Sequence, residues 1–191
     1  MHCTNFGNLN FWYLGNYPDI QEKLYQEIIS IFPGNEPVDD IEKINQCDYL
    51  DCCIKESLRL YPPVPLIARH LEEDVQLDGH LLLKGSDIVL NIYCIHRDPT
   101  VYPNPSEYNP ERFDSSNISN IPKGAYLPFG ISPRNCIGYR FALIEMKNFL
   151  IHILRKFKIF SVKKHEDVSV IIELILRPSC PLEIILQKRV C

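Results

Sequence analysis

The stretch that decides the fold is YLPFGISPRNCIGYRF at residues 126–141, which places Cys136 on a turn-rich loop directly before a long apolar run. A thiol at the start of a helix lies near unpaired backbone N–H groups and the positive end of the helix dipole, and both favour the thiolate. Arg134 adds a positive charge two residues earlier, and Gly138 leaves room for a flat group to approach the backbone. Because the thiolate is the nucleophile and the metal ligand, the spacing predicts a thiolate ligand site, and a haem iron is one group that such a site can hold.

The composition is that of a globular protein. The chain has 191 residues, of which 46% are hydrophobic and 23% charged, enough for one domain with a core. The net charge of −4 gives no reason to expect nucleic acid or an anionic membrane surface as a partner. Fifteen prolines against eight glycines, with clusters at 62–65, 99–110 and 122–133, predict an irregular middle of the chain. No apolar run is long enough to predict a transmembrane helix, and the first residues resemble neither a signal peptide nor an anchor.

The cysteines do not form a recognisable zinc or disulfide framework. No Cys-x-x-Cys pair and no histidine cluster at zinc spacing occurs, so a zinc or disulfide module is disfavoured. All except Cys136 are expected to be structural thiols, most of them buried and reduced. The eight are Cys3, Cys47, Cys52, Cys53, Cys94, Cys136, Cys180 and Cys191.

The hydrophobic periodicity predicts a mainly α-helical fold with small β hairpins and sheets, in one domain over residues 1–191. Helices are expected over about 18–31, 46–60 and 137–157, with a short helical piece after Asp39 or Asp40. The other segments are β-rich regions at 64–90 and 158–187, a meander at 98–122 and the ligand loop at 128–138. Within the second β-rich region, strands at 170–176 and 182–187 are expected to pair as a hairpin. Residues 1–16 are hard to interpret from the sequence.

Two features of the expected helices leave alternatives open. The apolar stripe of the helix at 137–157 is so wide that the helix is expected to be buried nearly all round. Glu56 and Arg59 lie three residues apart on one helix face, which by itself favours an exposed ion pair worth roughly 0.2–0.5 kcal/mol.

Four stretches in order resemble the cytochrome P-450 superfamily of haem-thiolate monooxygenases. They are KESLR at 55–59, NPERF at 109–113, PF at 128–129 and PRNCIG at 133–138. The sequences LYPPVP at 60–65 and HRDP at 96–99 are similar to the animal microsomal, fatty-acid hydroxylase-like family 4. The resemblance covers about residues 12–188 and implies the C-terminal, haem-ligating part of the fold, incomplete at the N-terminus.

The resemblance implies a role for several residues by position. Cys136 is similar to the axial thiolate ligand of the haem iron, and Phe129 to the aromatic residue that shields it. Arg134 and Arg69 resemble partners of the haem propionates, and Gly138 is the last glycine of the ligand motif. In the family, residues like Glu56, Arg59 and Arg112 form a buried triad that holds the meander, which reverses the exposed-pair interpretation. The positions that resemble the substrate-pocket lining, with core packing as the alternative, are Val64, Pro65, Leu66, Leu174 and Ile175.

The family also implies a cofactor and partners. These are haem b, electrons from NADPH through a flavoprotein reductase, and a lipophilic, fatty-acid-like substrate that receives one oxygen atom of O₂. The implied location is the cytosolic face of the endoplasmic reticulum membrane, although no anchor is present in this sequence. Lys123, Arg140 and Lys147 could face an acidic redox partner, with a solvated surface as the alternative, and His96 is expected to be a packing or surface histidine.

The sequence departs from the family pattern in two ways. Ser132 stands where the family favours glycine, and if that residue requires a positive φ, serine costs on the order of 1 kcal/mol. The oxygen-activating distal helix has no evident counterpart, since residues 11–15 resemble only its last turn. The alternative hypothesis is therefore a truncated, non-catalytic chain that retains the haem-ligand loop.

Overall fold

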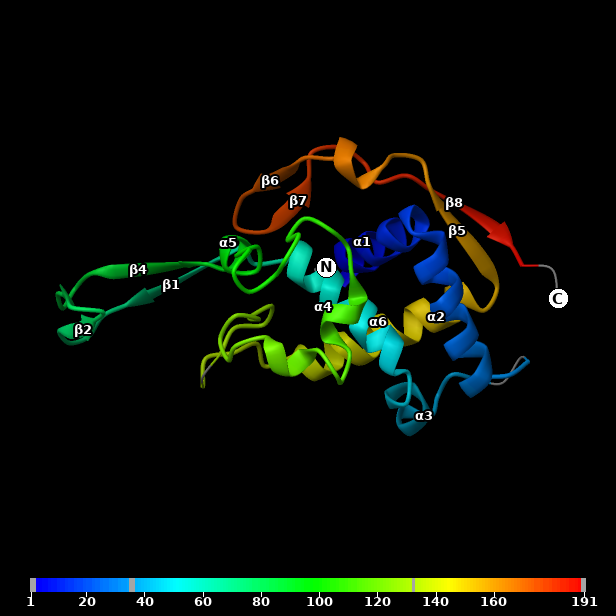
Figure 1. The fold of residues 1–191 in the computed structure, drawn as a ribbon, viewed down its shortest axis with the longest axis horizontal. Helices are drawn as coiled ribbons and strands as arrows, with labels where there is room; N and C mark the ends of the chain where they lie inside the picture. The colour runs from blue at the N-terminus through cyan, green and yellow to red at the C-terminus, as the bar shows by residue number, and fades with distance from the viewer. Residues whose placement is uncertain (1–2, 35–36, 132, 190–191) are drawn as a thin grey trace.

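The computed structural model describes residues 3–34, 37–131 and 133–189. Its centre is a group of helices, with β pairs and long loops around them (Figure 1). The α-helices are α1 (Cys3–Asn16), α2 (Pro18–Ile31), α3 (Ile41–Asn45), α4 (Asp48–Leu60), α5 (Ile92–Ile95) and α6 (Tyr139–Leu154). Three 3₁₀ turns are η1 (Pro110–Phe113), η2 (Ile118–Asn120) and η3 (His165–Asp167). The predicted mainly α fold with small β elements is confirmed. Over the described ranges, none of these helices is both long and apolar enough to cross a bilayer.

Proline and side-chain caps set the ends of the helices. Pro18 occupies the first turn of α2, where its missing N–H leaves no bond unmade. The Asp40 side chain accepts the N–H groups of Glu42 and Lys43 and so starts α3. α4 ends at Leu60, just before two prolines that cannot continue a helix.

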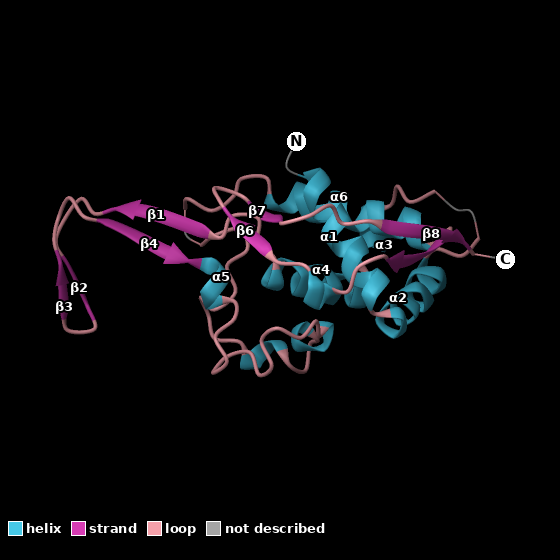
Figure 2. Ribbon diagram, turned by 90° about the horizontal axis from the view of Figure 1, so that it is seen from above, coloured by secondary structure: helices cyan, strands magenta, loops and turns pink. Residues whose placement is uncertain are grey.

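The strands of the described chain form antiparallel pairs. β1 (Leu66–His70) pairs with β4 (Asp87–Asn91), and β2 (Val75–Leu77) with β3 (His80–Leu82). These two pairs form an arm that extends from one end of the molecule (Figure 2). β5 (Phe157–Ser161) pairs with β8 (Ile184–Lys188), and β6 (Val170–Ile172) with β7 (Leu176–Pro178).

The hairpin expected from 170–176 and 182–187 is wrong. The chain turns back earlier, so that Ile172 pairs with Leu176, and residues 184–188 instead pair with β5. Strand periodicity alone does not select a partner, because it determines which face a side chain takes and not which strand lies alongside.

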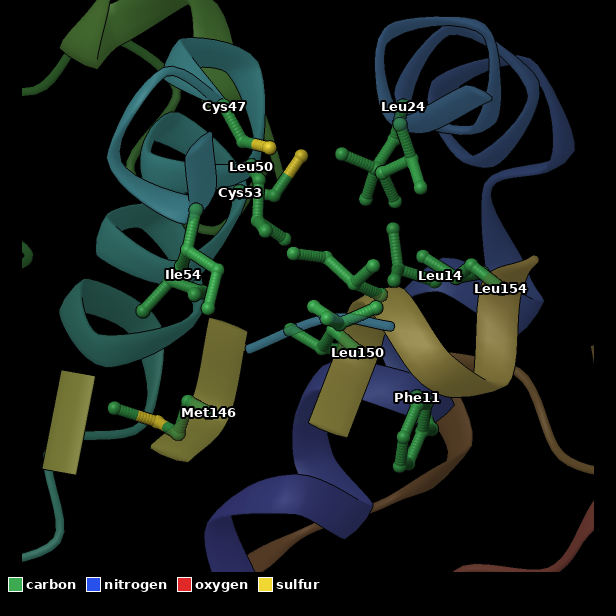
Figure 3. Close-up of a cluster of buried hydrophobic side chains, with 14 of the residues drawn as sticks. Phe11, Leu14, Leu24, Cys47, Leu50, Cys53, Ile54, Met146, Leu150 and Leu154 are labelled. Carbon is green, nitrogen blue, oxygen red and sulfur yellow. The ribbon is translucent and has the colours of Figure 1, made fainter. Parts of the chain in front are cut away.

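The hydrophobic core lies where α1, α2, α4 and α6 meet. Leu24 of α2, Ile54 of α4 and Leu154 of α6 have no exposed surface. Figure 3 shows these helices contributing side chains to one cluster, with Cys47 and Cys53 among them. α1 also packs against β5 so closely that a Cβ on Gly15 would lie 2.6 Å from the Ser161 nitrogen.

Two helices differ from the sequence-based expectation. α1 occupies most of the segment that was hard to interpret, and Trp12 and Tyr13 of this helix are buried. α6 is not buried all round. Phe141 and Phe149 are exposed, whereas Leu150 and Ile151 on the opposite side are in the core. α6 also begins later and ends earlier than expected, at Tyr139 and Leu154.

Candidate cofactor-binding site

Cys136 lies in the turn before α6 and is solvent-exposed. Its backbone N–H donates to the Phe129 carbonyl at 2.9 Å, which closes the loop that carries the thiol. The Gly130 N–H donates to the Leu127 carbonyl at 3.1 Å, and Gly130 has φ +78°, a conformation that favours glycine. Ser132, the departure from the family motif, lies outside the described residues.

A cavity of about 670 Å³ opens beside this loop. Its volume is in the range of small-molecule and cofactor sites. The loop contributes Phe129, Arg134 and Cys136, and Gly138 lines the same cavity at the start of α6. Further walls come from α1, α4, β1 and α6, and from the β6–β7 turn; their side chains are mainly apolar.

Two arginines line the cavity without a carboxylate partner among the described residues. Arg69 projects from β1, and Arg134 from the ligand loop. The hydrogen bond found for Arg69 goes from Nη1 to the Ala68 carbonyl at 2.8 Å. Since guanidinium groups bind carboxylates in charge-assisted hydrogen bonds, the cavity fits a ligand that carries acidic groups.

Cys136 supplies the thiol of the cavity. Among the cysteines that the structure describes, it is the one that lines the cavity. Cys47, Cys52 and Cys53 are buried elsewhere, and burial raises the pKa of Cys47 to about 12 and that of Cys52 to about 11. A thiol, two guanidinium groups without a carboxylate partner in the described chain, and apolar walls fit a haem with two propionates. A haem requires an axial ligand for its iron, cations for its propionates and apolar surface for its ring. No group of three His, Cys, Asp or Glu residues suited to a bare metal ion occurs in the described chain.

The structure brings Glu56, Arg59 and Arg112 together. Arg59 Nε and Nη2 donate to the two Glu56 carboxylate oxygens at 2.7 and 2.8 Å, and both side chains are fully buried. The exposed-pair interpretation is thereby excluded. Arg112 Nε lies 3.4 Å from Glu56 Oε1, which also accepts the Asn109 N–H at 2.8 Å.

Arg59 connects α4 to the meander. Its Nη1 donates to the carbonyls of His96 and Pro105, each at 2.8 Å, and Nη2 donates to the Glu107 carbonyl at 3.1 Å. One buried cation thus holds three carbonyls from a segment without regular structure.

His96 is a site residue that sequence reasoning placed only as packing or surface. It has no exposed surface, and its ring lies between α4 and the segment that precedes the ligand loop. Burial lowers the pKa of His96 to about 4, with the charges of Arg59 and Arg97 acting in the same direction. The sequence HRDP at 96–99 identifies His96, but it does not predict the two partners of the ring, which are the Arg59 carbonyl and the Leu127 N–H.

Residues 9–186 match the family described as Cytochrome P450. This chain belongs to the cytochrome P450 family. It is 42% identical to human "Cytochrome P450 4V2" over 182 residues, which is 95% of this chain and 35% of that protein. It is 40% identical to Drosophila melanogaster "Cytochrome P450 4c3" over 92% of this chain and 33% of that protein. Pig "Cytochrome P450 3A29" is 42% identical over 75% of this chain and 28% of its own length. The cytochrome P450 chain therefore spans about a third of the length of these curated relatives, and family 4 members are prominent among them.

The expected substrate positions divide into two groups in this cytochrome P450 chain. Val64, Leu174 and Ile175 line the cavity. Pro65 is buried with its carbonyl accepting the Tyr93 N–H, and Leu66 begins β1; neither is among the lining residues.

The basic residues considered for a redox partner also divide. Lys123 and Arg140 are exposed. Lys147 is not on a solvated face, because its side chain is only 5% exposed and its Nζ lies 2.8 Å from an Asp51 carboxylate oxygen.

Proposed function

We propose that the cytochrome P450 chain holds haem b in the 670 Å³ cavity, with the Cys136 thiolate as the axial ligand of the iron. The observation that carries this proposal is that Cys136, Arg134 and Arg69 line the same cavity, the first two from the ligand loop and the third from β1. The family match supports the same assignment.

The residues of the chain would each act on the bound group in a defined way. Cys136 would donate electron density through sulfur, and the Phe129 ring, half-buried beside it, would restrict access of water to the thiolate. Arg69 and Arg134 would bind the propionates and orient the ring plane. Thiolate-bound haem supplies cleavage of the O–O bond of O₂.

The proposed activity of the whole protein is that of a haem-thiolate monooxygenase. The apolar side chains of Val64, Leu174 and Ile175 favour a lipophilic substrate. The resemblance of residues 60–65 and 96–99 to the fatty-acid hydroxylase-like family 4 is the reason to propose a fatty-acid-like one. We propose that electrons arrive from NADPH through a flavoprotein reductase, and that the protein works on the cytosolic face of the endoplasmic reticulum membrane.

A second candidate is haem binding without turnover. The exposure of the cavity mouth favours it, since Phe141 is 71% and Leu174 85% exposed. Water that reaches the bound haem would favour side reactions that consume reducing equivalents. It would also weaken the binding of an apolar substrate.

One experiment tests haem ligation, and a second separates the two candidates. The full chain is loaded with haem, reduced and exposed to CO, and the strongly red-shifted Soret band of a thiolate-ligated haem is expected. Cys136→Ser should abolish that band, whereas Cys180→Ser, outside the cavity lining, should keep it. No such band in the parent chain would overturn the proposal. Product formation from a fatty acid with NADPH and reductase would then support the monooxygenase over the non-catalytic candidate.

A further inference from the structure

The segment just before the ligand loop is held by three side-chain hydrogen bonds. Tyr102 donates its hydroxyl to the Ala125 carbonyl at 2.9 Å, and Tyr126 donates to the Lys55 carbonyl of α4 at 3.1 Å. The Leu127 N–H donates to His96 Nε2 at 2.7 Å. Tyr126 and His96 both reach the backbone of α4, and His96 does so while it accepts a backbone N–H of the segment itself.

The hydrogen bonds fix the tautomer of His96. A backbone N–H only donates, so Nε2 must be unprotonated to accept from Leu127. Nδ1 therefore carries the proton, and it donates to the Arg59 carbonyl at 3.2 Å. The ring also stacks on Tyr126, with centroids 5.3 Å apart and planes inclined by 24°. A neutral imidazole with one donor and one acceptor satisfies both partners, and a charged one does not.

A continuous series of contacts joins His96 to Cys136. Arg59 Nη1 donates to the His96 carbonyl, and His96 Nε2 accepts from Leu127. The Leu127 carbonyl accepts the Gly130 N–H. The carbonyl of Phe129, the residue before Gly130, accepts the Cys136 N–H. Since each bond restrains the next segment, a shift at Leu127 moves the turn that presents the thiol.

We propose that His96 is a positioning residue for the thiolate ligand: its Nε2 anchors Leu127 and thereby sets where Cys136 Sγ lies relative to α4 and the cavity. This inference rests on the proposed haem ligation for its functional consequence, but its structural part concerns the haem-free chain. An ordinary packing histidine would be replaceable by any side chain of similar volume, whereas a positioning histidine requires an acceptor at the Nε2 position.

Three variants at position 96 separate the two roles. His96→Gln keeps an acceptor close to the position of Nε2, His96→Asn keeps a polar group close to Nδ1 only, and His96→Phe keeps the volume without either. Exchange of the Leu127 amide hydrogen in the haem-free chain is the direct readout. We expect exchange roughly 10- to 100-fold faster in His96→Phe and His96→Asn, as for one lost buried hydrogen bond, and near parental protection in His96→Gln.

A core variant controls for general destabilisation. Ile28→Ala, in the core of α2, removes buried surface away from the loop. In Ile28→Ala, the exchange rate of the Leu127 amide hydrogen should rise relative to the parent only as much as the rates of the α4 amides do. If His96→Asn protects Leu127 as well as His96→Gln, or if His96→Phe does not differ from the parent, the positioning role is overturned. If His96→Phe does not fold, the comparison of Leu127 exchange between His96→Gln and His96→Asn still tests the positioning role.

The functional consequence is read from the spectrum of the haem-loaded chain. We expect His96→Asn to shift part of the reduced CO complex from the thiolate-type Soret band to the band of haem without a thiolate ligand, and His96→Gln to restore the thiolate-type fraction. A parent chain without the thiolate-type band would contradict the proposed function and leave the amide exchange result to decide the role of His96. A parental spectrum in all three variants would overturn the consequence for the ligand.

Discussion

Arg59 and Glu56 lie one helical turn apart on α4 and form a two-point ion pair without any exposed surface, at 2.7 and 2.8 Å. The pair is stable in the interior because every strong donor of Arg59 finds an acceptor, three of them carbonyls of His96, Pro105 and Glu107. It therefore joins a helix to the meander and, through His96, to the ligand loop.

Removing one member of this pair should be strongly destabilising. Glu56→Gln leaves the Arg59 charge buried without a counter-charge, and we expect a loss of about 3–5 kcal/mol in the free energy of unfolding, measured by urea denaturation. The exposed pair of Lys23 and Glu111 is the control, and Lys23→Ala should cost less than about 1 kcal/mol. Equal losses for the two variants would contradict the role of burial.

The cavity arginines should contribute to haem affinity. Arg69→Gln and Arg134→Gln each remove a cation that would pair with a propionate, and we expect haem dissociation constants about 10-fold higher for each. Haem titration of the folded chain measures this. Lys84→Gln, exposed on the arm, removes a charge outside the cavity and should leave the affinity unchanged. An equal effect of Lys84→Gln would indicate only a general electrostatic contribution.

The contact between α1 and β5 should tolerate only glycine. A Cβ on Gly15 would meet the Ser161 backbone nitrogen at 2.6 Å, and backbone cannot move aside as a flexible side chain can. Gly15→Ala is therefore expected to destabilise the chain by about 1–3 kcal/mol in thermal or urea unfolding. Ser30→Ala, on the exposed face of α2, is the helix control and should change stability by less than about 0.5 kcal/mol. A neutral Gly15→Ala would show that the two segments are further apart.

The buried His96 should make stability depend on pH. Burial lowers the pKa of His96 to about 4, whereas an unperturbed histidine titrates near about 6.5. Above about pH 6.5 the His96 ring is neutral in both the folded and the unfolded chain. Its full contribution to the free energy of unfolding is therefore present there. As the pH falls from about 6.5 to about 4, the unfolded chain takes up a proton that the folded chain excludes, and about 3 kcal/mol of stability is lost.

The same measurement on His96→Gln isolates this contribution. Glutamine does not titrate. The unfolding free energy of the parent minus that of His96→Gln should therefore fall as the pH is lowered through that window, and it should level off at lower pH. A difference that is constant with pH would contradict the low pKa.

Much of the fold could be predicted from local patterns. Pro18 and the apolar spacing after it placed α2, and Asp40 was one of the two caps expected for α3. The tight turn that presents Cys136 also followed from the loop composition. These features depend on residues within a few positions of one another, where helix caps, prolines and glycines act directly.

Partner choice and burial could not be predicted in the same way. Lys147 looked like a surface cation because no local feature identifies Asp51 of α4 as its partner. The hairpin between 170–176 and 182–187 failed because β8 pairs with β5, a strand more than twenty residues earlier. The sequence of residues 1–16 gave no clear pattern, because the burial of residues 9–14 depends on contacts with β5 and α6, which come later in the chain.

The amino-acid sequence by itself determined the family, the loop that carries Cys136, and the residues Glu56, Arg59 and Arg112. It could do so because motif spacing and turn chemistry are local properties of the chain. Only the tertiary structure decided that Glu56 and Arg59 are fully buried, that Arg69 and Arg134 share a cavity with Cys136, and that His96 connects α4 to the ligand loop. These relationships join segments tens of residues apart, and they depend on which surfaces exclude water when the chain packs.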